Sequence, residues 1–120
     1  MAHTMDIAFD NMEPSAAVEA KVVEKAEKLA KLFERLSYIR TTISAPNRLP
    51  HKPKTYQVKI VLGIPGRADL VISNDHDAAH DHTDVNLAVR DAFASARRQL
   101  EEAAERLRGE VKTHAQHQAE

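Results

Sequence analysis

The densest group of potential metal ligands in the sequence is a short run of histidines and aspartates. The segments Asp75–Asp77 and His80–His82 each alternate the two residue types, and both side chains bind divalent metals. Their spacing matches none of the motifs of known mechanism, and the chain has no second ligand cluster. We therefore predict no metal site and no cofactor. Metal binding through His76, His80 and His82 is kept as an alternative.

Nucleophilic side chains are scarce. The chain has no cysteine, which excludes disulfides, thiolate metal sites and thiol nucleophiles. We expect Ser15 to cap a helix and Ser73 to end a strand, and no serine lies in a nucleophile-like turn. The three glycines, Gly63, Gly66 and Gly109, form no phosphate-binding loop. The sequence therefore predicts that the protein is not an enzyme and has no small-molecule substrate.

Basic residues could instead bind the phosphates of folded RNA, which requires charge and shape rather than base readout. The net charge is −1, yet residues 48–67 hold five basic residues and no acid, and residues 69–84 hold five aspartates and no Lys or Arg. The alternative is that these residues only keep helices and loops hydrated. The candidate RNA-binding residues are Lys21, Lys25, Lys28, Arg35, Arg48, Lys52, Lys54, Arg90, Arg97, Arg98, Arg106 and Arg108.

Two amphipathic helices must position most of these cations. Apolar residues recur every three or four positions after Ser15 as far as Leu36, and again from the expected cap Thr83 to Gly109, where we expect the second helix to end. Lys21, Lys25 and Lys28 each come one position before an apolar residue of the first helix. They therefore form a cationic ridge beside its buried stripe. In the second helix, Arg98 and Arg106 do not share one narrow stripe with Arg90 and Arg97.

The rest of the chain predicts four strands. Alternating or apolar runs place them at Met5–Phe9, Tyr38–Ser44, Tyr56–Leu62 and Ala68–Ser73, and Ile64–Gly66 predicts a type II turn between the last two. The fold class is therefore α+β in the order β-α-β-β-β-α, with two helices packed on one face of a four-stranded sheet. We predict a single domain over residues 1–109 and a tail over residues 110–120.

Composition bounds the cellular setting. A chain of 120 residues with 42% hydrophobic residues suits one compact domain, and no apolar run reaches the roughly 18 residues of a membrane span. The N-terminus lacks the features of a signal peptide, so we expect a cytoplasmic protein with no membrane partner. Aromatic residues are only 4% and scattered, which argues against base stacking. The partly polar exposed sheet face is compatible with a monomer or a weak dimer.

Several segments resemble one known family. They are His82–Phe93, Ala96–Leu100, Arg108–His114 and Tyr56–Leu62 continuing into Ile64–Gly66. Over about residues 5–114 the chain is similar to the ribosome hibernation promoting factors and RaiA, also called sigma-54 modulation proteins. It looks like their short form. The family's fold is similar to a double-stranded-RNA-binding domain and agrees with the order of elements predicted above.

The resemblance implies binding to the small ribosomal subunit and its rRNA, in the channel that mRNA and tRNA would occupy. Translation would be blocked while the ribosome is stored, with no catalytic residue needed. By position, the binding residues would be Lys21, Lys25 and Lys28 on the first helix, and Arg90, Arg97, Arg98, Arg106 and Arg108 on the second.

Two departures from the family pattern support a second hypothesis. Asn86 replaces an aromatic residue, and Glu101, Glu102 and Glu105 occupy a stretch that is often basic in the relatives. Both would weaken ribosome binding. The alternative function is a regulatory protein-interaction module that keeps the fold with lost or weak ribosome affinity.

Overall fold

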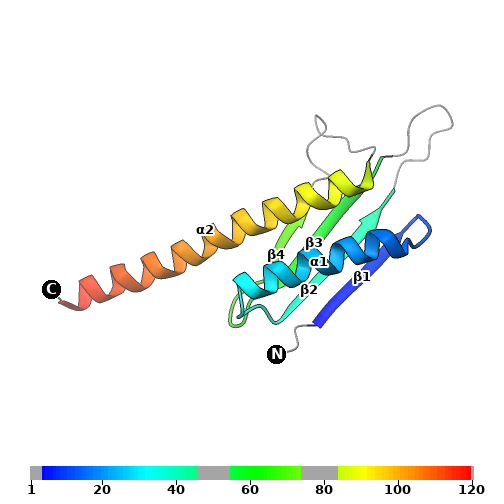
Figure 1. The fold of residues 1–120 in the computed structure, drawn as a ribbon. Helices are drawn as coiled ribbons and strands as arrows, with labels where there is room; N and C mark the ends of the chain where they lie inside the picture. Colours follow the sequence, from blue (N-terminus) through cyan, green and yellow to red (C-terminus); the bar gives the residue numbers. More distant parts are fainter. Residues whose placement is uncertain (1–3, 46–54, 74–83, 120) are drawn as a thin grey trace.

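The computed structural model of the chain describes residues 4–45, 55–73 and 84–119, with side chains up to Arg106. The elements follow the order predicted from the sequence (Figure 1). They are β1 (Thr4–Asp10), α1 (Ala16–Leu32), β2 (Tyr38–Ser44), β3 (Gln57–Gly63), β4 (Leu70–Ser73) and α2 (Val85–Ala119).

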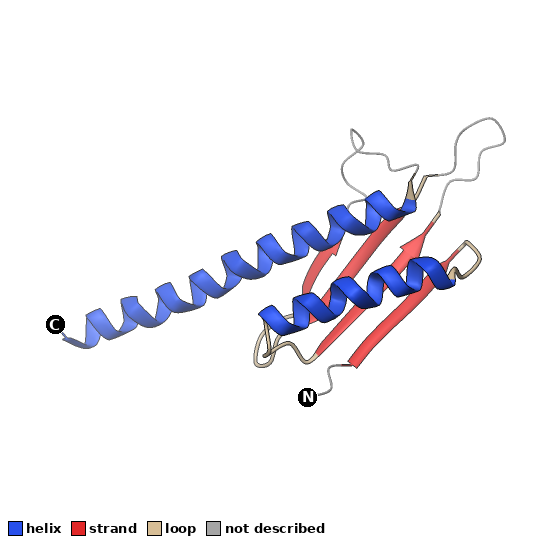
Figure 2. Ribbon diagram, viewed as in Figure 1, coloured by secondary structure: helices blue, strands red, loops and turns tan. Residues whose placement is uncertain are grey.

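The four strands form one sheet in sequence order, β1-β2-β3-β4. β1 and β2 run parallel because α1 connects them as a crossover helix, whereas β2, β3 and β4 pair antiparallel. Both helices lie on the same face of the sheet (Figure 2). The predicted α+β fold class is therefore confirmed, and the other face of the sheet has no helix over it in the described part of the chain.

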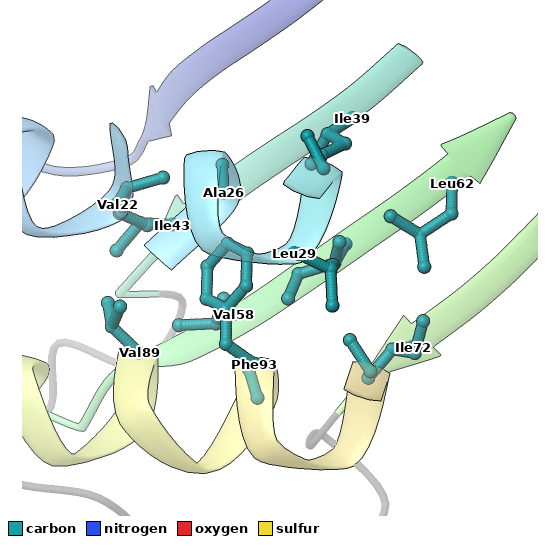
Figure 3. Close-up of a cluster of buried hydrophobic side chains, with 14 of the residues drawn as sticks. Val22, Ala26, Leu29, Ile39, Ile43, Val58, Leu62, Ile72, Val89 and Phe93 are labelled. Atoms are coloured by element: carbon teal, nitrogen blue, oxygen red, sulfur yellow. The ribbon is translucent and has the colours of Figure 1, made fainter. Parts of the chain in front are cut away.

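The core lies between that covered face and the two helices. Alternate residues of the central strands are buried: on β3, Val58 and Ile60 are buried, while Lys59 between them is exposed. Thr41 is the one buried polar residue of the described chain. Figure 3 shows Phe93 of α2 pointing toward α1, beside Leu29. This shared core fixes how the two helices face each other.

The first helix begins where the sequence predicted. Ser15 has extended backbone angles, and its side chain accepts a hydrogen bond from the Val18 N–H at 3.3 Å. The predicted end at Leu36 is wrong, because α1 stops at Leu32 and Phe33 leaves the helical conformation. Leu36 is still buried. It reaches the core from the loop after the helix. Its spacing of three residues from Phe33 therefore matched the helical pattern although the helix had already ended.

The predicted hairpin turn between β3 and β4 is also confirmed. The Arg67 N–H donates to the Ile64 carbonyl at 3.1 Å, and Gly66 has a φ of 75°. A positive φ at the third residue of a turn that has proline at the second is the geometry of type II.

Both ends of α2 differ from the prediction. The helix begins at Val85, and Asp84 caps it: its carboxylate accepts from the Asn86 N–H at 2.9 Å and its carbonyl from the Ala88 N–H at 3.1 Å. Thr83, the expected cap, lies outside the described residues. The predicted stop at Gly109 is wrong, since α2 continues to Ala119.

The continuation past Gly109 has a physical reason. A helix ends at glycine when that residue takes a left-handed conformation, and within the described residues only Gly66 among the glycines has a positive φ. Otherwise a glycine costs a helix only about 1 kcal/mol relative to alanine. Residues 110–119 therefore belong to a helix that extends beyond the sheet (Figure 1). The division into a domain of residues 1–109 and a tail of 110–120 stays a prediction.

Candidate nucleic-acid interface

Four of the predicted RNA-binding residues meet in one groove between the two helices. Lys25 and Lys28 come from α1, and Arg90 and Arg97 come from α2. The groove has a volume of about 200 Å³, and apolar side chains complete its lining: Leu29, Leu32, Phe93 and Ala94. We call this site, with its eight lining residues, the interhelical groove.

The packing of the helices explains why these cations converge. On α1, Lys25 precedes Ala26 and Lys28 precedes Leu29, and both apolar residues are buried. On α2, Arg90 follows the buried Val89. Because the buried stripes of both helices cover the same sheet face, the positions beside the stripes face each other across the gap between the helices. The groove therefore follows from the one-residue offset between the basic and apolar residues.

Acidic neighbours accompany three of the four cations. The Nζ of Lys28 lies 3.4 Å from Glu24 Oε1, and Arg97 Nε lies 3.1 Å from Glu101 Oε1. Arg90 contacts the adjacent Asp91 at 3.2 Å. The side chains of these basic residues are 60–72% exposed. Such surface ion pairs contribute about 0–1 kcal/mol, so a phosphate can replace the carboxylate at little cost.

Lys25 is different from these three cations. It has no carboxylate partner among the residues that the structure describes. Lys25 is half-buried and lines the groove together with the other three cations. Lys25 is therefore the cation of the groove best placed to accept a new anionic partner.

Comparison with known proteins places the chain in a family. A family model described as sigma 54 modulation protein / S30EA ribosomal protein matches residues 5–108. The chain belongs to this family. The resemblance noted in the sequence is thus confirmed, whereas a comparison with curated protein sequences gives no match.

Solved structures with the same fold include two bacterial proteins. A ribosomal subunit interface protein from Coxiella burnetii superposes with a TM-score of 0.68 at 14% identity, covering 85% of this chain and 98% of its own. The N-terminal domain of Protein Y from Thermus thermophilus gives 0.61 at 15% identity, covering 82% and 97%. At such low identity these matches establish the fold alone.

The other described candidates of this S30EA-family domain lie outside the groove. Lys21 is one turn before Lys25 on the same side of α1, so it extends the line of cations. Arg35 lies beyond the end of α1, in a hollow shared with Glu101. Arg98 contacts the Ser95 hydroxyl at 3.4 Å, and Arg106 lies against the β3–β4 hairpin. The predicted set is thus brought together only in part.

Several predictions fall on parts of the chain that are not described. Arg48, Lys52 and Lys54 lie outside the described residues, and so does the side chain of Arg108. The histidine segment His76–His82 lies outside them as well. Among described residues there is no group of three side chains suited to hold a metal ion. Neither described helix has an apolar stretch long enough to cross a bilayer.

Sequence reasoning missed one feature of the groove, its exposed apolar side. Leu32 is 55% exposed, and it lies four residues after Lys28 on the same side of α1. That spacing was the available signal, but the residue was hidden among the helix's other apolar positions. An apolar surface beside cations suits the sugar and base faces of a nucleic acid as well as its phosphates.

A second missed feature is a network on the open face of the sheet. The Tyr38 hydroxyl donates to the Asp69 carboxylate, and Arg40 lies over the Tyr38 ring at 5.3 Å while its Nε is 3.7 Å from Asp6. The hydrogen bond to Asp69, followed by desolvation, raises the pKa of Tyr38 above its usual value. The network therefore links the segment before β4, through Asp69, to β2 and β1.

Proposed function

We propose that this protein binds the small ribosomal subunit through the interhelical groove, which contacts rRNA phosphates. Occupying the mRNA and tRNA channel there, it keeps the ribosome inactive by steric exclusion. The observation that carries the proposal is the convergence of Lys25, Lys28, Arg90 and Arg97 from two helices. Membership of the S30EA family and the fold it shares with a ribosomal subunit interface protein support the same role.

The local gathering of cations supports a polyanionic partner such as RNA over an uncharged one. A protein of net charge −1 attracts polyanions only if its cations are gathered locally. Four cations replacing four counterions would make the logarithm of affinity fall with the logarithm of salt concentration with a slope of roughly −3. Binding of this kind is steric and electrostatic. The proposal therefore assigns no catalytic residue and no cofactor, and it places the protein in the cytoplasm with ribosomes.

One observation favours the alternative of a protein-interaction module. An apolar hollow at the end of α1 is lined by three acids and one cation, Glu34, Glu101, Glu105 and Arg35. This acidic surface adjoins the groove and would repel RNA at that end. In this alternative the protein's partner would be a protein, and rRNA would be absent from the complex. Metal binding by the histidine segment has no supporting observation among the described residues.

Sedimentation through sucrose with purified small subunits tests the proposal. The variant Lys25→Glu/Arg97→Glu should leave the subunit fraction, whereas the wild type should sediment with it at low salt and be released as salt rises. The control Lys31→Glu/Lys59→Glu makes the same change in net charge on exposed residues outside the groove and should still bind. Equal binding by both variants would refute the groove as the site. Failure of the wild type to sediment at any salt would refute ribosome binding itself.

A further inference from the structure

The edge of the sheet opposite α2 is open along the whole of β1. This strand has seven residues, pairs only with β2, and has no described neighbour on its outer side. The Asp10 carbonyl accepts from Ala45 and therefore points toward β2. Since backbone groups alternate along a strand, those of Met5, Ile7 and Phe9 point outward. Three consecutive hydrogen-bonding positions thus face solvent at this edge.

The side chains of the same residues leave an apolar strip beside the edge. Met5, Ile7 and Phe9 face the helices but are only half-buried, unlike the buried residues of β2 and β3. α1 packs against β1 as well as against α2. Lys25 and Lys28 line the groove on the α2 side of the helix, and Val23 lies on another side of it, in a separate hollow. An added strand would bury apolar side chains between β1 and this side of α1.

Acidic residues border the strip on both faces. Glu19 and Glu27 lie with Val23 around a surface hollow of about 530 Å³ on α1. Asp6 and Asp10 are exposed on the open face of the sheet, where Asp10 is in register with Ser44 and Asp6 lies 3.7 Å from Arg40 Nε in a surface ion pair that a ligand cation can replace at little cost. The protein therefore presents negative charge at the β1 edge and positive charge at the interhelical groove, with α1 between them.

We propose that the β1 edge binds an extended, lysine- or arginine-rich segment of another protein, which adds to the sheet as a fifth strand. Main-chain hydrogen bonds to Met5, Ile7 and Phe9 hold the segment, as in other cases of strand addition. Its alternate side chains are apolar toward the helices and basic toward Asp6 and Asp10. A second copy of this chain is disfavoured, because it would bring the same acids to both sides of the junction.

Amide chemical shifts of the full-length protein test this site with a defined probe. The probe is a capped heptapeptide of alternating lysine and valine, and the control peptide has glutamate in place of lysine. The lysine peptide should shift the amide signals of Met5, Ile7 and Phe9, and the glutamate peptide should not. Two further peptides carry methyl groups on the backbone nitrogens of either all valines or all lysines. Only one of these two sets of N–H groups faces β1, so one methylated peptide should lose binding and the other should keep it.

Protein variants separate the edge from general charge. Asp6→Lys/Asp10→Lys should weaken binding of the lysine peptide at least tenfold, while Glu34→Lys/Glu102→Lys, with the same change in net charge, should stay within twofold of wild type. The proposal would be overturned if both variants lost the same affinity for the lysine peptide. It would also be overturned if the peptide shifted amide signals only away from β1, or if neither methylated peptide bound more weakly. A dimer of the free protein with protected β1 amides would overturn it too, since a second copy would then hold the edge.

Discussion

At the level of single residues, the position of a side chain beside a buried stripe decides whether it can join a site. The basic residues next to Ala26 and Leu29 were identified from spacing alone, because helical periodicity fixes which side of a helix they occupy. Sequence spacing does not reveal which residues of another helix lie opposite. Spacing within one helix does separate Arg98 from the stripe of Arg90 and Arg97, and in the structure Arg98 contacts Ser95 and does not line the groove.

Gly63 allows a first test at this scale. A Cβ at this position would collide with the Tyr38 ring across the β2–β3 pair, so Gly63→Ala should lower the free energy of unfolding by about 1–2 kcal/mol in urea titrations. In a Tyr38→Ala background the same substitution should cost clearly less, since the ring is gone and only the Ser37 hydroxyl, 3.0 Å from the added Cβ, remains close. Equal costs in the two backgrounds would show that the contact with Tyr38 is not the cause.

The hydroxyl of Tyr38 predicts a dependence on pH. Its pKa is raised in the folded protein, chiefly by the hydrogen bond to Asp69, so the protonated tyrosine favours the folded state. This contribution is complete below the unfolded pKa of about 10 and is lost as the pH rises through the folded value. The free energy of unfolding of the wild type should therefore fall more steeply above pH 10 than that of Tyr38→Phe. Parallel pH profiles would contradict the assignment.

At the level of elements, the centres of helices and strands could be predicted and their ends could not. Periodicity identified every element, because each one buries a face against the same core. Ends depend on a few weak local interactions, which tertiary packing overrides. Leu36 looked helical because it is buried, although it reaches the core from a loop, and Gly109 looked like a stop because glycine often is one.

Substitution of Gly109 tests the corrected end of α2. In a continuous helix, Gly109→Ala should increase the far-UV helical signal and stabilise the helix by up to about 1 kcal/mol. If Gly109 instead ended the helix in a left-handed conformation, alanine would be strained there. A loss of helical signal or of thermal stability in this variant would therefore contradict the continuous α2.

At the level of the whole molecule, the fold places positive and negative charge on different surfaces, which the net charge does not reveal. The net charge of −1 combines a cationic groove between the helices with an anionic edge at β1. Sequence reasoning predicted local charge clusters and the layer of two helices on a sheet. It contained no prediction of strand order, and the order β1-β2-β3-β4 is what puts the acidic strand β1 at the edge farthest from α2.

The central claim is that rRNA contacts the helix face of the protein through the interhelical groove. Leu32 in the groove and Val71 on the open sheet face allow a matched test, because their exposures are 55% and 51%. A photo-reactive amino acid placed at one or the other position in full-length protein would be irradiated on purified small subunits, and the cross-linked products analysed for RNA. We predict cross-links to rRNA from position 32 and none from position 71. Cross-links from position 71 alone would contradict the account.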